Sequence, residues 1–359
     1  MEIKLRHTIV FNDFDTIVTA CISNPNKIII LMSSGEVIKY NIKEQKHFFL
    51  FSVKSNIGYE DGGFDLNAES KIYTLDEITV IVNNYKRHGY IYYPGKYDAL
   101  HLWREDYHAD ISDYPIALFK KEDVPHIIYS AAWNHLQIMN LDTRQILTAA
   151  KSLIEENAEE KHIEFYKNHV EHNKLPWPHR YDYFFGELLL SPNNKKFLSA
   201  GWSWGSSDSY NVYDVENFIN SNRISDIKIG FWEHENRAVH WIDEETIAIT
   251  YNPFTEGDDD ASSDSPDEIH LYKLNNEKAE IIKKNKIAGN INVVNSKFCF
   301  NKNINSFISF SKEIGLALLS LEGNIIFQDK NLKIDGYNNE ANLLFAIDNN
   351  KIIIYEIIL

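Results

Sequence analysis

The chain has 359 residues, of which 44% are hydrophobic and 13% aromatic, which is ample for a large core and argues against global disorder. The formal net charge is −16 at pH 7, from 36 basic and 52 acidic side chains. A surface this acidic repels phosphate groups, which excludes general nucleic-acid binding and disfavours docking on anionic membranes. It suits a basic protein partner, although a requirement for solubility alone would also account for it.

The N-terminal residues and the cysteine content predict a cytoplasmic protein. Charged and apolar residues alternate over residues 1–6, so we expect no signal peptide there. No apolar run approaches the ~20 residues that are needed to span a bilayer. Cys21 and Cys299 do not make a disulfide framework. We expect two free thiols on the inner strands of separate sheets.

The chain repeats a meander of short strands. In residues 184–214 an apolar run at 188–190 meets the turn Ser-Pro-Asn-Asn at 191–194, and a second run, a loop and a third strand follow. The same order recurs with a spacing of roughly 40–50 residues, which is typical of propeller blades. The seven units occupy residues 17–40, 72–103, 116–142, 184–214, 239–274, 298–327 and 334–358.

The last unit lacks a strand that the N-terminus can supply. Residues 334–358 hold three strands, whereas residues 3–11 form a spare strand ahead of the first unit. Placing the spare strand in the gap completes the last blade and removes an open sheet edge. We therefore predict an all-β protein with a single domain over residues 1–359, a seven-bladed β-propeller of four-stranded antiparallel blades closed by the N-terminal strand. A β-sandwich is the alternative, but it would not need seven similar meanders.

Two units carry a resemblance to a known class of repeats. Residues 184–214 and 136–147 resemble bacterial WD40-like or YVTN-like repeats in the Ser-Pro-Asn-Asn hairpin, the small residues of the second strand, and the Tyr-Asp or Leu-Asp that closes the third. The Gly-His and Trp-Asp pairs of standard WD40 repeats are absent, and Tyr213-Asp214 is the nearest match. The resemblance implies a propeller with a scaffold or binding role. It assigns no active site.

Irregular segments gather on one predicted face. Turns between the first and second and between the third and fourth strands of a blade share one face, and there the turns are mostly tight. The opposite face receives the long segments, which include a helical insertion at about 151–180 between blades 3 and 4 and an acidic loop at 252–268 in blade 5. Long loops on a rigid frame are where binding usually occurs, although they can also be tolerated insertions.

Aromatic and basic residues on this loop-rich face form the candidate site. Trp, Tyr and Arg dominate binding hot spots because they bury large areas and keep a polar group. Trp202 has an alternative role, which is to fill the gap between two blades. The predicted partner-binding residues are Trp133, His135, His179, Arg180, Tyr181, Trp202, Trp204 and Trp232.

Other chemistry receives less support from the sequence. His162, His169 and His172 share the spacing of zinc ligands, but no recognised zinc motif surrounds them. The acidic loop does not match the spacing of calcium loops, and we expect it to be solvated. No nucleophile, phosphate-binding or dinucleotide motif is present. We assign no catalytic residue, metal or cofactor.

The functional hypothesis is therefore a binding or scaffold propeller that recognises a protein or peptide, possibly a basic one, through its loop-rich face. An enzyme that acts on a small molecule or glycan with channel-lining residues is the alternative. A further alternative is an acidic, immunity-type inhibitor of a basic protein. Nucleic acid and membrane are not expected as partners.

Overall fold

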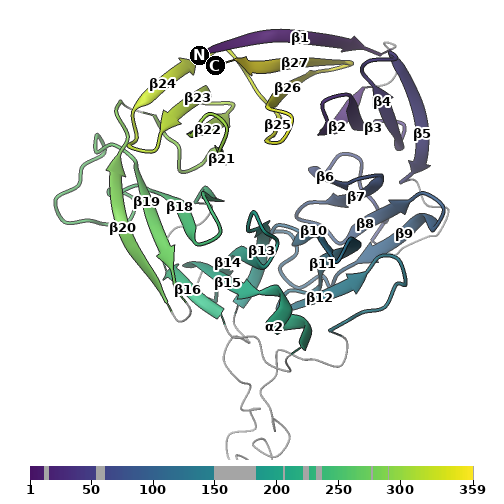
Figure 1. The fold of residues 1–359 in the computed structure, drawn as a ribbon, viewed down its shortest axis with the longest axis horizontal. Helices are drawn as coiled ribbons and strands as arrows, with labels where there is room; N and C mark the ends of the chain where they lie inside the picture. Colours follow the sequence, from purple (N-terminus) through teal and green to yellow (C-terminus); the bar gives the residue numbers. More distant parts are fainter. Residues whose placement is uncertain are drawn as a thin grey trace, which may run out of the picture.

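The predicted propeller is confirmed. The computed structural model describes residues 1–11, 16–53, 61–148, 183–204, 207–220, 226–231, 237–275, 278–289 and 291–358. Seven antiparallel sheets stand around a central axis, and the two ends of the chain lie side by side in the ring (Figure 1). The predicted helical insertion at about 151–180 lies outside the described residues.

Each sheet is a blade made mainly of strands that follow one another in sequence. Blade 1 contains β2 (Ile17–Asn24), β3 (Lys27–Met32), β4 (Glu36–Asn41) and β5 (Lys46–Ser52). Blade 2 contains β6 (Ser70–Leu75), β7 (Ile78–Asn83), β8 (His88–Tyr93) and β9 (Tyr97–Trp103). Blade 4 contains β13 (Tyr183–Leu190), β14 (Lys196–Ser203), β15 (Ser207–Asp214) and β16 (Asp226–Phe231). Blade 5 contains β17 (Val239–Trp241), β18 (Thr246–Tyr251), β19 (Glu268–Leu274) and β20 (Ala279–Lys286). Blade 6 contains β21 (Lys297–Asn301), β22 (Ser306–Ser311), β23 (Gly315–Ser320) and β24 (Ile325–Asp329).

Blade 7 is built from both ends of the chain, as predicted. Its strands follow the order β1 (Glu2–Val10), β27 (Lys351–Ile358), β26 (Leu343–Asp348) and β25 (Gly336–Asn338). The β1–β27 pair runs antiparallel from Glu2 opposite Ile358 to Val10 opposite Lys351. The N-terminal strand therefore takes the outermost position of the last blade and closes the ring.

Blade 3 differs from the others in the described part of the chain. It contains three strands, β10 (Ile116–Lys121), β11 (Val124–Ala132) and β12 (His135–Asn140). At its outer edge a single bridge joins Met139 to Ile146, where the other sheets carry a fourth strand. Several elements lie outside the predicted units. They include the short helix α2 (Val215–Asn220), the outer strands β5 and β20, and β16, which lies between the predicted fourth and fifth units.

The burial of each strand depends on its place in the blade. Every residue of β3 and of β7 is buried, whereas most residues of β5 and β20 are exposed. A strand buried on both faces is largely apolar, which is why the second strands read as continuous runs such as Ile28 to Leu31. The clusters of buried residues join neighbouring blades, so that no blade has a separate core.

The outermost strands are bulged. In each of the six described four-stranded sheets, the register shifts once where the outermost strand pairs with its neighbour. A bulge bends the strand and interrupts its regular row of hydrogen-bonding groups. Because exposed sheet edges invite pairing with other chains, these bulges protect the rim of the ring from aggregation.

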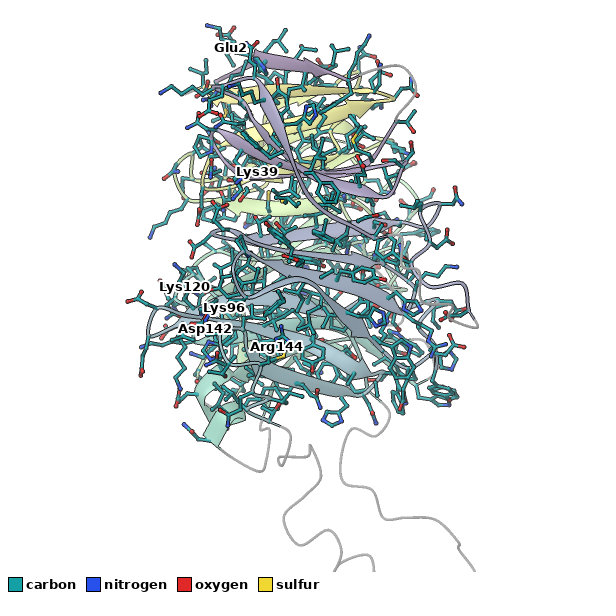
Figure 2. The ribbon with its side chains drawn as sticks, turned by 90° about the vertical axis from the view of Figure 1, so that its right-hand side faces the viewer. Glu2, Lys39, Lys96, Lys120, Asp142 and Arg144 are labelled. Atoms are coloured by element: carbon teal, nitrogen blue, oxygen red, sulfur yellow. The ribbon has the colours of Figure 1, made fainter. Side chains whose placement is uncertain are left out.

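The face of tight turns is held together by local polar contacts. Asn24, Asn193, Asp243 and Asn301 each accept a hydrogen bond from the backbone N–H two residues on, which closes the first hairpin of four blades. Ion pairs then join blades: Lys39 with Glu77 at 3.3 Å, Lys120 with Asp76 at 2.6 Å, and Lys96 with Asp142 at 3.7 Å. Figure 2 shows Lys96, Lys120 and Asp142 together at one side of the ring.

Both cysteines are unpaired, as predicted. Cys21 lies on β2 and Cys299 on β21, the first strands of blades 1 and 6. Burial raises the pKa of the Cys21 thiol to about 11. No helix among the described residues is long and apolar enough to cross a membrane.

Ring closure generates a testable prediction on β1. Ile9 is 2% exposed and packs in the core that blades 1 and 7 share, whereas Leu5 on the same strand is 56% exposed. We expect Ile9→Ala to lower the free energy of unfolding by about 2–4 kcal/mol, because it removes buried methyl groups and leaves a cavity. Leu5→Ala is the matched control and should cost less than about 1 kcal/mol. Urea unfolding measures both, and equal losses would show that β1 does not pack as described.

Candidate functional site

Aromatic side chains from three blades meet on the face opposite the tight turns. Tyr107 and His108 lie between β9 and β10, Trp133 lies in the turn from β11 to β12, and blade 4 supplies the rest. Phe184 is the second residue of β13 and pairs with Trp202 near the end of β14, so both lie at the same face. We call the following residues the aromatic patch: Tyr107, His108, Trp133, Phe184, Trp202 and Trp204.

The aromatic patch has a buried floor and an exposed upper layer. Phe184 and Trp202 stack with ring centroids 3.8 Å apart and planes 5° apart, and Trp202 is only 8% exposed. The ring of Trp133 packs against that of Phe184, with their centroids 4.4 Å apart. Above them Trp204 is 59% exposed and Tyr107 is 49% exposed, with their rings nearly parallel at 6.4 Å. Two large aromatic side chains are thus held at the surface by a packed layer beneath them.

A buried arginine shapes the loop that carries Tyr107. Arg104 follows β9 and is buried, with its guanidinium over the ring of Tyr114 at 4.6 Å. It donates to four backbone carbonyl groups within 2.7–2.9 Å, those of Lys86, Ala109, Ser112 and Asp113. The fork of N–H donors therefore fixes the loop at several points at once, which a lysine could not do.

The same loop is joined to the floor of the patch. The indole N–H of Trp202 donates to the hydroxyl oxygen of Ser112 at 2.9 Å. His108 makes edge contacts with Trp202 at 5.8 Å and with Trp204 at 5.4 Å. The loop between blades 2 and 3 and the second strand of blade 4 therefore position each other.

His135 lies close to the patch in sequence, but it is a half-buried titratable residue and not an exposed aromatic one. It begins β12, two residues after Trp133, and is half-buried. Burial lowers the pKa of His135, and the nearby charge of Glu105 opposes that shift only in part. Its Nε2 atom is buried and has no hydrogen-bond partner among the described residues. The imidazole is therefore neutral at pH 7.

The central channel borders the patch. A cavity of about 1010 Å³ is lined by strands from around the ring and includes Ile111, Ser112 and Trp202. At this border Lys71 pairs with Asp113 at 2.6 Å and lies 3.7 Å from Glu187. Burial alone would raise the pKa of Asp113, but the charge of Lys71, the hydrogen bonds from Lys71 and Asn84, and the charge of Arg104 together hold that pKa below its ordinary value.

The acidic loop is anchored at its base and exposed at its tip. Asp267 is buried and accepts hydrogen bonds from the backbone of Val293 and from the side chain of Asn252. Residues 258–260, three consecutive aspartates, are exposed to solvent. In the described part of the chain, no group of three or more His, Cys, Asp or Glu side chains is arranged to hold a metal ion.

The predicted site is assembled only in part from described residues. Trp133, Trp202 and Trp204 lie together in the patch, and His135 is its close neighbour in the sequence. His179, Arg180, Tyr181 and Trp232 lie outside the described residues. Sequence reasoning missed Tyr107, His108, Phe184 and Arg104. Tyr107 lies between the predicted units 72–103 and 116–142, where a connecting loop is expected. The contacts of Arg104 are with backbone carbonyls and leave no pattern in the sequence.

Comparison with known proteins shows the fold. No family model matches the chain, and no curated protein matches its sequence. Among solved structures, the WD40 domain of Neurospora crassa Pan2 is similar with a TM-score of 0.55 and 11% identity, covering 98% of this chain and 94% of that one. The WD40 β-propeller domain of Doa1 is similar with a TM-score of 0.52 and 10% identity, covering 99% and 97%. The chain therefore has the fold of a WD40-type β-propeller.

The role of Arg104 is testable by hydrogen exchange. We expect Arg104→Lys to lower the free energy of unfolding by about 2–4 kcal/mol, because buried carbonyl groups lose their donors. Backbone amides at 105–113 should exchange faster. Arg144→Lys is the control, because Arg144 is exposed and stacks on Tyr97 at 4.5 Å, away from this loop. Unchanged exchange at 105–113 in the Arg104 variant would contradict the role assigned to it.

Proposed function

We propose that this chain is a binding propeller that recognises a protein or an extended peptide through its loop-rich face. The observation that carries the proposal is the exposure of Trp204 above a packed floor. A tryptophan this exposed costs solvation free energy in the unbound protein, and burial against a partner recovers it. Since the ring is already held in place, little side-chain entropy is lost on binding.

The residues of the site have different roles in this proposal. Trp204 and Tyr107 contact the partner, while Trp202 is buried and packs against Phe184 and His108, the two rings that contact Trp204. Trp133 and His135 come from blade 3, and Trp133 packs against Phe184 of blade 4. His179, Arg180, Tyr181 and Trp232 remain part of the proposed site on the strength of the sequence alone. The similar WD40 domains agree with this proposal at the level of the fold.

The face of tight turns is less suited to binding. Several of its charged side chains are already engaged between blades, as with Lys120 and Asp76 at 2.6 Å. A partner would have to break these ion pairs or bind around them. The loop-rich face instead offers large exposed aromatic side chains, which are the residue types enriched in hot spots.

The enzyme alternative would have to use the channel. There Lys71 lies beside both Asp113 and Glu187 and keeps Asp113 ionised at neutral pH. A glycosidase needs one carboxyl group with a raised pKa to protonate the leaving group, and Asp113 is shifted the other way. We therefore favour binding over catalysis. An acidic inhibitor of a basic protein is a special case of the binding proposal, and the same experiment would identify it.

We also propose a cytoplasmic location and partners other than nucleic acid or membranes. Two unpaired thiols suit a reducing compartment. A net charge of −16 opposes approach to phosphate backbones and anionic lipids.

A pull-down from the native cell extract, with binding then measured for the captured partner, tests the proposal. We expect Trp204→Ala to weaken binding by at least about thirtyfold, which corresponds to roughly 2 kcal/mol for the loss of a central aromatic anchor. Phe49→Ala is the matched control, because Phe49 on β5 is 59% exposed like Trp204 but lies on the rim. If Phe49→Ala weakens binding and Trp204→Ala does not, the proposed face is wrong.

A further inference from the structure

Among the described residues, the exposed charges in the loop that carries Tyr107 share one sign. The loop from Glu105 to Asp113 contains Glu105, Asp106, Asp110 and Asp113 and no lysine or arginine. Glu105, Asp106 and Asp110 are exposed, in the same loop as exposed Tyr107. A partner that covers the aromatic patch therefore meets several carboxylates within a single loop.

In the part of the chain that the structure describes, four basic side chains near this loop are already paired with carboxylates or backbone carbonyls. Lys86 pairs with Asp65 at 3.3 Å, and Arg87 pairs with Asp61 at 3.3 Å and approaches Asp106 at 4.0 Å. Arg104 is buried against backbone carbonyls. Lys71 pairs with Asp113. An excess of negative charge therefore remains at Glu105, Asp106 and Asp110.

Carboxylates beside exposed aromatic rings suit one kind of cation best. A guanidinium is planar, stacks on Trp and Tyr faces, and donates to carboxylates through a fixed fork, whereas an ammonium is a strongly hydrated point charge. The protein itself uses this arrangement elsewhere on blade 2. Arg87 stands over the ring of Trp103 at 4.8 Å while it pairs with Asp61 at 3.3 Å.

We infer that the partner covers the aromatic patch with an arginine-bearing, positively charged segment. Its guanidinium groups stack on Trp204 and Tyr107 and pair with Glu105, Asp106 and Asp110. This inference rests on the proposed function and adds the chemistry of the partner. A second copy of this chain is disfavoured, because two patches facing each other would bring like charges together within a protein of net charge −16.

Short fluorescent peptides test the inference by anisotropy. The probe alternates arginine with leucine, and two matched peptides carry citrulline or lysine in place of every arginine. Citrulline keeps the shape of arginine and loses its charge. We therefore expect no detectable binding of the citrulline peptide at protein concentrations that saturate the arginine peptide. The lysine peptide should bind more weakly than the arginine peptide. The inference would be overturned if the arginine peptide bound no more tightly than the citrulline peptide or the lysine peptide. It would also be overturned if the arginine peptide failed to bind the wild type.

Two triple variants separate a local site from general attraction. One replaces Glu105, Asp106 and Asp110 by Gln, Asn and Asn, and the other replaces the exposed aspartates 258–260 of the acidic loop by Asn. Both remove three negative charges, so long-range attraction falls equally. We expect the variant at Glu105, Asp106 and Asp110 to weaken binding of the arginine peptide at least about tenfold, since three partly exposed ion pairs together contribute about 1.4 kcal/mol. The variant in the acidic loop should weaken this binding less than about twofold. Equal effects would show general electrostatic attraction and overturn the inference.

The captured native partner distinguishes the two proposals. If Trp204→Ala abolishes its binding and the triple variant at Glu105, Asp106 and Asp110 does not, the binding face stands and the arginine-bearing partner is wrong. If neither variant affects its binding, both proposals fail. Light scattering that shows a dimer of the wild type and a monomer of Trp204→Ala would mean that a second copy covers the patch, and would also overturn the inference.

Discussion

The pairing of β1 with β27 is the interaction on which the rest of the structure depends. It joins residues from opposite ends of the chain, from Glu2 opposite Ile358 to Val10 opposite Lys351. The cores lie between blades, as where Ile9, Ile28 and Ile352 share one cluster, so each blade needs both neighbours to bury its apolar side chains. An open ring would leave an unpaired strand and an unburied face at each end. The stability of any one blade is therefore a property of the closed ring.

A closed ring leaves two faces with different physical constraints. Hairpins on the face of tight turns are short, and their Asn and Asp side chains close them locally, so side chains there are free to form ion pairs between blades. On the opposite face the chain must cross from one blade to the next, which requires longer segments. Arg104 shows how such a segment is made rigid, because it binds four carbonyl groups of neighbouring turns. The aromatic patch lies where this rigid segment meets blade 4.

Much of the fold was predictable because its determinants are local or periodic. Continuous apolar runs such as Ile28 to Leu31 identify the second strands, and the missing strand of the last unit identifies the closure. The convergence of Trp133, Trp202 and Trp204 followed from their places relative to the predicted turns. The strand β16 was missed because its residues 226–231, Asp-Ile-Lys-Ile-Gly-Phe, form a short alternating run inside a polar segment. The roles of Arg104 and Ser112 were not predictable, because Arg104 binds backbone carbonyl groups, which every residue has, and Ser112 binds Trp202, which is 90 residues away.

Two nearby tryptophans of blade 4 have different roles in the structure, Trp202 in supporting the fold and Trp204 in forming the exposed surface. Trp202 is buried, stacks on Phe184 and binds Ser112, so its ring belongs to the folded state whether or not a partner is present. Trp204 is 59% exposed, and its ring rests against Phe184 and His108, so it is held at the surface without being part of the core. A change at Trp202 alters stability and the position of the 104–113 loop together, whereas a change at Trp204 alters mainly the surface that is offered to a partner. Near the end of β14, Trp202 therefore serves folding, whereas Trp204 is available for recognition. Substitutions at Trp204 and at the charged residues beside Tyr107 can change the partner in evolution while the ring is preserved.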